Sequence, residues 1–459
     1  MALDRQAESY DVLIIGGGPA ATHCSGFLAD AGRRVGIVED ELLGGECDYY
    51  ACMPSKTLLR PGEALAAVRD APGASERVAD GPVAPDGLFG WRDFMVNNYD
   101  DGHEVAWADS KGVEIIRGHG RLAGPGVVEV GGRRLSAADI VLATGSSPSL
   151  PPVPGLKDLV GLWSNREATG ATEVPERLLI MGGGPVGVEL AQVFRSLGSE
   201  VVVVEGQDRL LPHSPQALGE ALGTAFEADG IELHLGAQVT AARRDGDDYV
   251  LVLGEEGEVR GDRLLVATGR RPRVHDIGLE TVGLDPGARQ IDVDASMRAG
   301  EGLWAIGDAT GIWLLTYVGK YQGRVAAANI LGEPTVADYS AVPTVVFTHP
   351  QAAAVGEADG PLTATVSMAS VARTYTYMRH YEDRPDFLTL VSDGRRLTGA
   401  YALGPEAGEW LQQATLAIRA RVPLEVFFDT IQPFPSFSEV FLSALIELRS
   451  KARQSPVGT

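Results

Sequence analysis

The stretch YDVLIIGGGPAATHCSGFLADAGRRVGIVED, residues 10–40, decides the fold of the first part of the chain. An apolar run leads into a turn of small residues, then an amphipathic helical segment, then a second apolar run that ends at Glu39. The small residues permit a tight strand-to-helix turn and let backbone N–H groups approach a pyrophosphate. They are Gly16, Gly18 and Ala21. Glu39 follows where a carboxylate binds ribose hydroxyls, so the stretch predicts a dinucleotide-binding unit.

The same pattern returns in RLLIMGGGPVGVELAQVFRSLGSEVVVVEG, residues 177–206. Its key residues each lie 166 positions after their counterparts, and they are Gly182, Gly184, Gly187 and Glu205. One GxGxxG is weak evidence, but two copies in strand–helix–strand context, each with an acid at the same spacing, are strong evidence. The chain therefore has two predicted nucleotide-binding units.

Both units close with a similar phrase, IVLATGSSP at residues 140–148 and LLVATGRRP at residues 264–272. In each, a buried strand runs into a turn of small residues that lets the backbone pass close to a bound cofactor. The cofactor-contacting candidates are Thr144, Gly145 and Gly269. Asp308, at the end of the apolar run in GLWAIGDATG, suits a carboxylate that accepts hydrogen bonds from a polyol or ribose hydroxyl.

Composition narrows the function. A net charge of −23 over 459 residues argues against a nucleic-acid partner, which requires a basic face. No apolar run approaches the ~20 residues of a membrane span, and the first residues do not have the layout of a signal peptide. We therefore expect a cytoplasmic protein with no membrane association. Its three cysteines do not form a secreted disulfide framework.

Two of these cysteines lie close together in GGECDYYACMPSK, residues 44–56. Cys47 and Cys52 fall at the start of a predicted helix, where one helical turn brings them within disulfide reach and the helix N-terminus favours a thiolate. The alternatives are inert thiols or half of a zinc site, but zinc needs further ligands and the chain has no second Cys pair or close His pair. A redox-active disulfide without a metal is the preferred interpretation. Cys24, within the first helical segment, is interpreted as a small buried hydrophobe.

The motifs GGGPAA, GGECDYYACMPSK, GGGPVGVELA, ATGRRP, GDATG and TIQPFPSFSE occur in family order between about Tyr10 and Arg449. Through them the chain resembles the class I FAD-dependent pyridine nucleotide–disulfide oxidoreductases, such as dihydrolipoamide dehydrogenase, glutathione reductase and mercuric reductase. The resemblance implies an α/β fold with two Rossmann-like domains and a C-terminal α+β dimerisation domain. It also implies a homodimer in which the C-terminal domain of one subunit completes the active site of the other.

The implied domains follow the motifs. An FAD-binding domain covers residues 1–150, an NAD(P)-binding domain residues 151–272, a return to the FAD-binding domain residues 273–338, and an interface domain residues 339–459.

Residue roles follow from the resemblance. Cys47 is the outer thiol that exchanges with substrate, and Cys52 is the inner thiol that contacts the flavin. Lys56 lies beside the flavin and pairs with Glu189. The implied FAD-binding set is Gly16, Gly18, Ala21, Glu39, Gly45, Lys56, Thr144, Gly145 and Asp308. The implied NAD-binding set is Gly182, Gly184, Gly187, Glu205 and Gly269.

Glu205 bears on the choice of nicotinamide cofactor. A carboxylate at this position accepts hydrogen bonds from the free 2′-hydroxyl of NADH and repels the 2′-phosphate of NADPH. Gln207 and Asp208 follow where NADPH-using relatives carry basic residues, although Arg209 is close. NADH is therefore expected in preference to NADPH.

The tail departs from the family. The disulfide reductases carry His-x-His-Pro-Thr-x-x-Glu, in which the second His is the acid–base for the outer thiol. Here Gln432 replaces the first His and Phe434 the second, while Glu439 remains as the orienting acid. The last His of the chain is His380, so this tail offers no imidazole. Since a positioned acid–base accelerates proton transfer about 10²–10⁴-fold, ordinary dithiol–disulfide turnover should be slower by a factor of that order.

At this position the chain resembles one unusual family member, 2-ketopropyl-coenzyme M oxidoreductase/carboxylase, which also has a Phe. There an apolar pocket lets a carbanion meet CO2 instead of a proton. That enzyme has a His where this chain keeps Glu439, and it uses NADPH. Two smaller departures are the residues between the cysteines, Asp48 to Ala51 instead of Leu-Asn-Val-Gly, and Tyr317 in place of a His.

Four hypotheses of function follow. The first is an NADH-dependent flavoenzyme whose Cys47–Cys52 disulfide acts on a non-standard small sulfur substrate, a thioether or mixed disulfide, with C–S cleavage or carboxylation included. The second is a dihydrolipoamide dehydrogenase-like enzyme that obtains protons from water, Glu439 or Tyr50. The third is a diaphorase that reduces quinones or metal ions at the flavin. The fourth, a non-enzymatic flavin-binding scaffold, conflicts with the presence of both cysteines, Lys56, Glu189 and Glu205.

Overall fold

The computed structural model describes residues 8–254 and 257–454. These form two compact units, each drawn from three separate parts of the chain. The first unit lies within Met1–Pro54, Arg92–Ser149 and Gly269–Asp338. The second lies within Ser55–Trp91, Leu150–Thr268 and Tyr339–Thr459.

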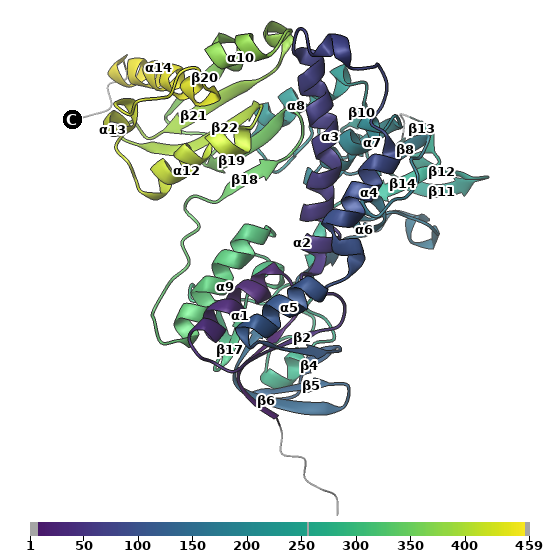
Figure 1. Ribbon diagram of the computed structural model, residues 1–459, viewed down its shortest axis with the longest axis vertical. Coiled ribbons are helices and arrows are strands. Elements are labelled where there is room, and N and C mark those ends of the chain that lie inside the picture. Colours follow the sequence, from purple (N-terminus) through teal and green to yellow (C-terminus); the bar gives the residue numbers. More distant parts are fainter. Residues whose placement is uncertain (1–7, 255–256, 455–459) are drawn as a thin grey trace, which may run out of the picture. The chain divides into compact units, whose positions relative to one another are not determined.

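An eight-stranded sheet forms the centre of the first unit (Figure 1). Its strand order is β16-β17-β6-β1-β2-β3, with β5 pairing β6 and β4 pairing β5. The bounds are β1 Glu8–Ile15, β2 Val35–Glu39, β3 Glu114–Arg117, β4 Gly120–Leu122, β5 Val127–Val130, β6 Arg133–Leu142, β16 Arg298–Gly300 and β17 Leu303–Ala305. The pairs β1–β2, β1–β6, β2–β3 and β6–β17 are parallel.

Helices cover this sheet, which explains the continuous apolar run of β1. A parallel sheet is buried on both faces, and all four residues from Val12 to Ile15 are accordingly buried. α1 (Pro19–Asp30) packs against α9 (Thr316–Ile330) and contacts α5 (Gly102–Lys111). Gly323 of α9 permits the close approach, since a Cβ there would overlap the backbone oxygen of Ala20.

The residues that follow the two Ala-Thr-Gly phrases pair with one another. β7 (Ser146–Pro148) and β15 (Arg270–Pro272) form a two-stranded antiparallel ribbon within the first unit. The two similar sequence phrases, each of which ends one nucleotide-binding unit, therefore meet in the structure.

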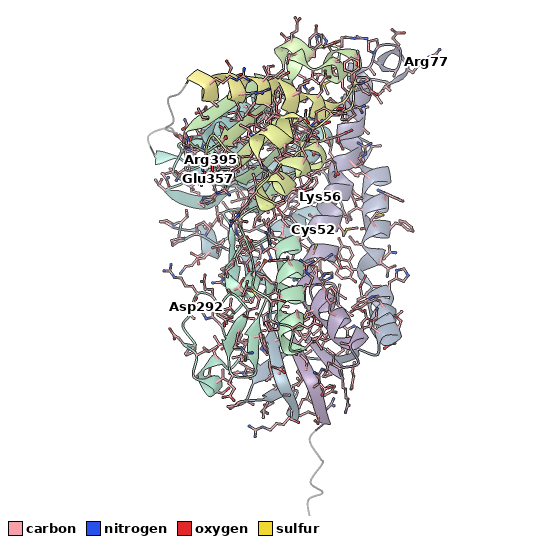
Figure 2. The ribbon with its side chains drawn as sticks, turned by 90° about the vertical axis from the view of Figure 1, so that its left-hand side faces the viewer. Cys52, Lys56, Arg77, Asp292, Glu357 and Arg395 are labelled. Carbon is pink, nitrogen blue, oxygen red and sulfur yellow. The ribbon has the colours of Figure 1, made fainter. Side chains whose placement is uncertain are left out.

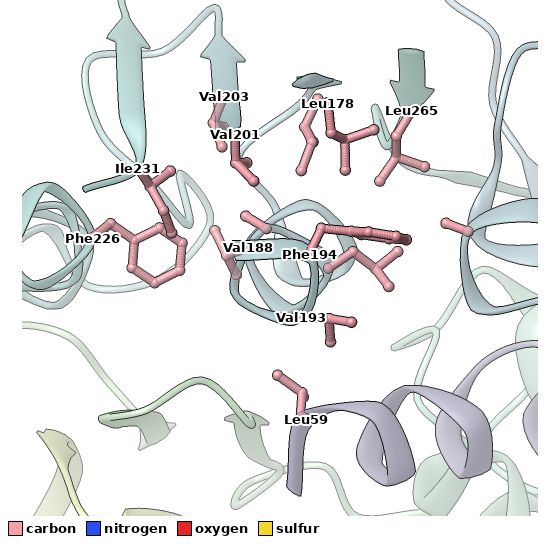
Figure 3. Packing of buried hydrophobic residues seen from close by; sticks show 14 of the residues in the cluster. Leu59, Leu178, Val188, Val193, Phe194, Val201, Val203, Phe226, Ile231 and Leu265 are labelled. Atoms are coloured by element: carbon pink, nitrogen blue, oxygen red, sulfur yellow. The ribbon is translucent and has the colours of Figure 1, made fainter. Parts of the chain in front are cut away.

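The second unit contains a four-stranded parallel sheet, ordered β10-β9-β8-β14, and a three-stranded antiparallel sheet, ordered β11-β12-β13. Their bounds are β8 Arg177–Met181, β9 Glu200–Glu205, β10 Glu232–Leu235, β11 Ala241–Asp245, β12 Asp248–Val252, β13 Glu258–Gly261 and β14 Arg263–Val266. The helices of this part are α6 Asn165–Thr169, α7 Pro185–Ser196 and α8 Gln216–Ala228. Figure 3 shows Phe194 of α7 among the aliphatic side chains of this core.

A five-stranded antiparallel sheet, ordered β18-β19-β22-β21-β20, completes the second unit. Its strands are β18 Pro343–Val346, β19 Gln351–Gly356, β20 Leu362–Ser367, β21 Phe387–Ser392 and β22 Leu397–Gly404. Its helices are α10 Ala372–Tyr377, α11 Ala407–Trp410, α12 Gln412–Arg419, α13 Leu424–Phe428 and α14 Val440–Gln454, and α14 packs on β20 and β21. The expected α/β fold class, with two Rossmann-like units and a C-terminal α+β region, is confirmed, whereas the proposed domain boundaries stay a prediction.

Two helices link the units in sequence. They are α3 (Cys52–Asp70) and α4 (Pro85–Met95). Across the described residues, every helix is too short or too polar to cross a bilayer.

We expect Phe194→Ala to destabilise the protein by about 3–5 kcal/mol, because it empties a ring-sized space in a close-packed core. Phe194 is 1% exposed and its ring centroid lies 5.5 Å from that of Trp163. Urea unfolding measures the loss. Phe94→Ala, at a side chain that is 66% exposed, is the matched control and should change stability by less than about 1 kcal/mol. Equal losses in the two variants would contradict this description of the core.

Candidate active site

Two glycines bring the backbone of each nucleotide-binding unit into close contact with its Ala-Thr-Gly turn. Gly16 has φ 102° and Gly182 has φ 112°, backbone angles that residues with a side chain rarely adopt. A Cβ on Gly16 would overlap the carbonyl of Ala143, and one on Gly182 would overlap the carbonyl of Ala267. The two copies of the sequence motif therefore make the same backbone contact, in which a glycine lies against the carbonyl of an alanine.

The helices that follow these turns begin without a side-chain cap. Gly18 is the N-cap of α1 and Gly184 the N-cap of α7, and among the described residues neither helix has a side-chain cap hydrogen bond. A Cβ on either glycine would point into open space. Uncapped N–H groups beside open space fit a dinucleotide pyrophosphate. Ala21 is buried, and a Cβ on Gly187 would overlap the carbonyl of Gly182, so both positions require small residues.

The two predicted ribose-binding acids are held in the same way. An oxygen of Glu39 accepts a hydrogen bond from the backbone N–H of Gly17 at 2.6 Å, and an oxygen of Glu205 accepts one from Gly183 at 2.7 Å. The second oxygen of each accepts from the backbone N–H two residues later. Burial raises the pKa of Glu39. Each carboxylate is therefore fixed by backbone donors and keeps lone pairs for a sugar hydroxyl.

The other predicted cofactor residues of the first unit are joined by hydrogen bonds. The Thr144 hydroxyl donates to the carbonyl of Arg273 at 2.6 Å, and the Arg273 N–H donates to Gly145 at 2.9 Å. Asp308 accepts a hydrogen bond from the Ser146 hydroxyl. Burial raises the pKa of Asp308. Gly269 accepts a backbone hydrogen bond from Ser149 at 2.9 Å.

Cys47 and Cys52 lie on two helices instead of on one helical turn. Cys47 is in the short α2 (Gly45–Tyr49), which begins after Gly44, and Cys52 begins α3. Hydrogen bonding with the Cys52 side chain, together with burial, raises the pKa of the Cys47 thiol. Burial raises the pKa of Cys24 to about 12, which agrees with an inert core thiol.

Thr316 contacts both sulfur atoms, a feature that sequence analysis missed. Its hydroxyl donates to the Cys47 sulfur at 3.3 Å and lies 3.3 Å from the Cys52 sulfur. Thr316 is also the first residue of α9, as Cys52 is the first residue of α3. The positive ends of two helices therefore lie at the cysteine pair, where each stabilises a thiolate by about 0.3–1 kcal/mol.

Lys56 and Glu189 form an ion pair within the second unit. Their Nζ and Oε2 atoms are 2.7 Å apart, with the lysine side chain 37% and the glutamate side chain 7% exposed. Glu189 also accepts a hydrogen bond from the backbone N–H of Phe347 at 3.0 Å, and the Lys56 Nζ lies 4.8 Å from the Phe347 ring centroid. Lys56 is labelled on α3 in Figure 2. The predicted partnership of these two residues is present.

The tail carries an exposed phenyl ring. Phe434 is 72% exposed in the second unit. The Oε2 atom of Glu439 is buried and has no hydrogen-bond partner among the described residues. Gln432 donates a hydrogen bond to the side chain of Gln413 at 3.1 Å. The role predicted for Glu439 stays a prediction.

Comparison with known proteins agrees with this fold. Residues 10–327 match the family model described as pyridine nucleotide-disulphide oxidoreductase, and residues 342–445 match its dimerisation domain. Dihydrolipoyl dehydrogenase of Chlamydia muridarum is 32% identical over 98% of this chain and 99% of its own length. Mercuric reductase of Acidithiobacillus ferrooxidans is 34% identical over 94% of this chain and 81% of its own length.

Among solved structures, LpdA from Mycobacterium tuberculosis has a TM-score of 0.84 at 24% identity, and covers 96% of this chain and 100% of its own. This likeness concerns the fold. The site and fold define a flavin- and pyridine-nucleotide-using oxidoreductase. The chain belongs to the pyridine nucleotide-disulphide oxidoreductase family, and its dimerisation domain supports a homodimer.

We expect Lys56→Met to destabilise the protein by about 1–3 kcal/mol, because it leaves the buried Glu189 carboxylate without its cation. Lys56→Met with Glu189→Gln should lose less than Lys56→Met alone, since no unpaired charge remains. Urea unfolding measures both. Lys111→Met, which breaks the more exposed pair with Asp30, is the control and should cost about 0–1 kcal/mol. A double variant less stable than Lys56→Met would refute the pairing argument.

Proposed function

We propose that this family member uses NADH and FAD to reduce a Cys47–Cys52 disulfide, which then acts on a small, non-standard sulfur substrate, a mixed disulfide or thioether. One observation carries the proposal: the Thr316 hydroxyl contacts the sulfur atoms of both Cys47 and Cys52, at the N-termini of α3 and α9. In the sequence, the aligned tail has Phe434 instead of an imidazole. When bound, FAD supplies the two-electron connection between the nicotinamide and the disulfide.

Other residues of the chain would bind the two cofactors and place charge beside the flavin. The uncapped starts of α1 and α7 would hold the two pyrophosphates, and Glu39 and Glu205 would accept hydrogen bonds from the ribose hydroxyls. The Glu205 carboxylate, already bonded to two backbone N–H groups, favours NADH over NADPH because it would repel a 2′-phosphate. Lys56, held by Glu189, would place a positive charge beside the flavin.

Phe434 supports a substrate other than a standard dithiol. In the homodimer this ring would come from the partner subunit's tail to the cysteine pair, as the family resemblance implies. A phenyl ring neither accepts nor donates a proton there, and it makes the thiol pocket more apolar. Cleavage of a C–S bond, with CO2 as a further reactant, belongs to the proposed range, and a dihydrolipoamide dehydrogenase-like reaction is the alternative.

Anaerobic titration with NADH tests the electron path. We expect uptake of four electrons per FAD, because flavin and disulfide each accept two. A long-wavelength absorption band from a Cys52 thiolate beside the oxidised flavin should appear after the first two electrons. The same titration with NADPH should require a much higher concentration to reach the same end point. Uptake of only two electrons would refute the redox-active disulfide, and equal response to both nucleotides would refute the role given to Glu205.

We expect Phe434→His to raise the turnover of dihydrolipoamide at least tenfold, because a positioned imidazole contributes about 10²–10⁴-fold and Glu439 is present to orient it. Steady-state kinetics with dihydrolipoamide and NAD+ measures the gain. Phe434→Leu, which changes shape without adding a base, is the matched control and should show no gain. Equal activity of Phe434→His and the parent protein would show that the missing base does not limit this reaction.

A further inference from the structure

A cavity of about 370 Å³ lies within the second unit, between α3, α7 and the turn from β18 to β19. This volume falls in the range of small-molecule sites. α3 contributes Glu63, Ala66 and Arg69, which share one helical face, and α7 contributes Gln192 and Arg195, which share another. None of the lining residues that the structure describes belongs to the predicted FAD- or NAD-binding sets, so the cavity is a separate place for a ligand.

Hydrogen bonds fix the walls of this cavity. The backbone N–H of His349 donates to Oε1 of Gln192 at 2.7 Å, and Nε2 of Gln192 donates to the His349 carbonyl at 2.7 Å. The same Nε2 donates to Oδ2 of Asp229 at 3.2 Å. From α3, a guanidinium nitrogen of Arg69 donates to the Gly81 carbonyl at 2.6 Å. The lining is therefore held by its own contacts, as a preorganised ligand site requires.

Two guanidinium groups line the cavity without a carboxylate partner. Arg195 donates to the carbonyl oxygens of Asp229 at 2.9 Å and Ser199 at 3.4 Å, and Arg69 donates to that of Gly81. Within the described part of the chain, neither guanidinium lies within ion-pair distance of an acidic side chain. Because a guanidinium has five N–H donors, both keep donors for a ligand carboxylate.

An acidic side chain in the lining is likewise unpaired. Among the residues that the structure describes, no cation lies within ion-pair distance of the Asp229 carboxylate, whose hydrogen bond comes from the neutral amide of Gln192. Partial burial raises the pKa of Asp229. Glu63 differs, since it pairs with Arg60 at 2.8 Å. The cavity therefore presents uncompensated charges of both signs.

Apolar and neutral groups form the rest of the wall. Phe347 is 38% exposed, and Leu59 of α3 lies in the same core as Val193 of α7, which it faces in Figure 3. Burial lowers the pKa of His349 to about 4, so its imidazole is neutral at pH 7 and adds no charge. In the described chain its hydrogen bonds are made by its backbone, and the ring N–H can donate to a ligand.

We propose that this cavity binds a small zwitterionic amino acid, with its carboxylate at Arg69 and Arg195, its ammonium group at Asp229, and an apolar side chain against Leu59 and Phe347. A simple anion would leave Asp229 without a cation, and a simple cation would leave both guanidinium groups without an anion. A zwitterion compensates both. The inference goes beyond the proposed function, because it concerns a second ligand that takes no part in the electron path.

Three probes of matched shape test the charge pattern. They are L-leucine, 4-methylpentanoate, which lacks the ammonium group, and 3-methylbutylamine, which lacks the carboxylate. Calorimetric titration of the FAD-bound protein should show L-leucine binding, with each singly charged analogue about tenfold weaker or more, because each loses its charge-assisted hydrogen bonds. Saturating NAD+ should leave the affinity for L-leucine unchanged, since the nucleotide sets share no residue with the cavity.

Two variants should give reciprocal results that misfolding would not produce. Arg195→Gln should weaken L-leucine about tenfold and leave 3-methylbutylamine unchanged, because the amine has no carboxylate to lose. Asp229→Asn should weaken L-leucine to a similar degree and leave 4-methylpentanoate unchanged or tighter. Arg77→Gln, at an exposed arginine of the same unit that Figure 2 labels, is the matched control and should bind all three probes as the parent protein does.

Each other result would overturn the inference. Equal binding of L-leucine and 4-methylpentanoate by the parent protein would refute recognition of a zwitterion. Displacement of L-leucine by NAD+, or binding of neither L-leucine nor L-phenylalanine at millimolar concentration, would refute the site. If Arg195→Gln does not retain FAD, Arg69→Gln decides, and an unchanged affinity for L-leucine refutes the inference. The electron count with NADH tests the proposed function separately, because these titrations involve no electron transfer.

Discussion

The close contact between a left-handed glycine and a neighbouring carbonyl is the constraint on which the two nucleotide-binding units depend. Gly16 meets Ala143, and Gly182 meets Ala267. Because a side chain at either glycine would overlap that carbonyl, the first strand can end against the closing strand only where glycine is present. The uncapped helix and the fixed acid then follow at the same spacing in both units.

The cysteine pair lies soon after the first of these nucleotide-binding motifs in the sequence. After β2 the chain enters α2 and then α3, so Cys47 and Cys52 follow soon after Glu39 in the sequence. Gly44, with φ 113°, allows the turn into α2 and leaves space for the Asp48 carboxylate. α9 reaches the same place from a distant part of the chain and contributes Thr316. Local sequence therefore supplies the thiols, whereas tertiary structure supplies the hydroxyl between them.

The fold could be predicted because its signals are local and repeated. Glycine spacing, apolar runs and the final acid of each unit are read directly from the sequence, and the α/β class is confirmed. The role of Thr316 could not be predicted, since 269 residues separate it from Cys47 and no motif connects them. The two-helix arrangement of the cysteines was also missed, because a five-residue spacing does not reveal that Tyr50 and Ala51 separate α2 from α3.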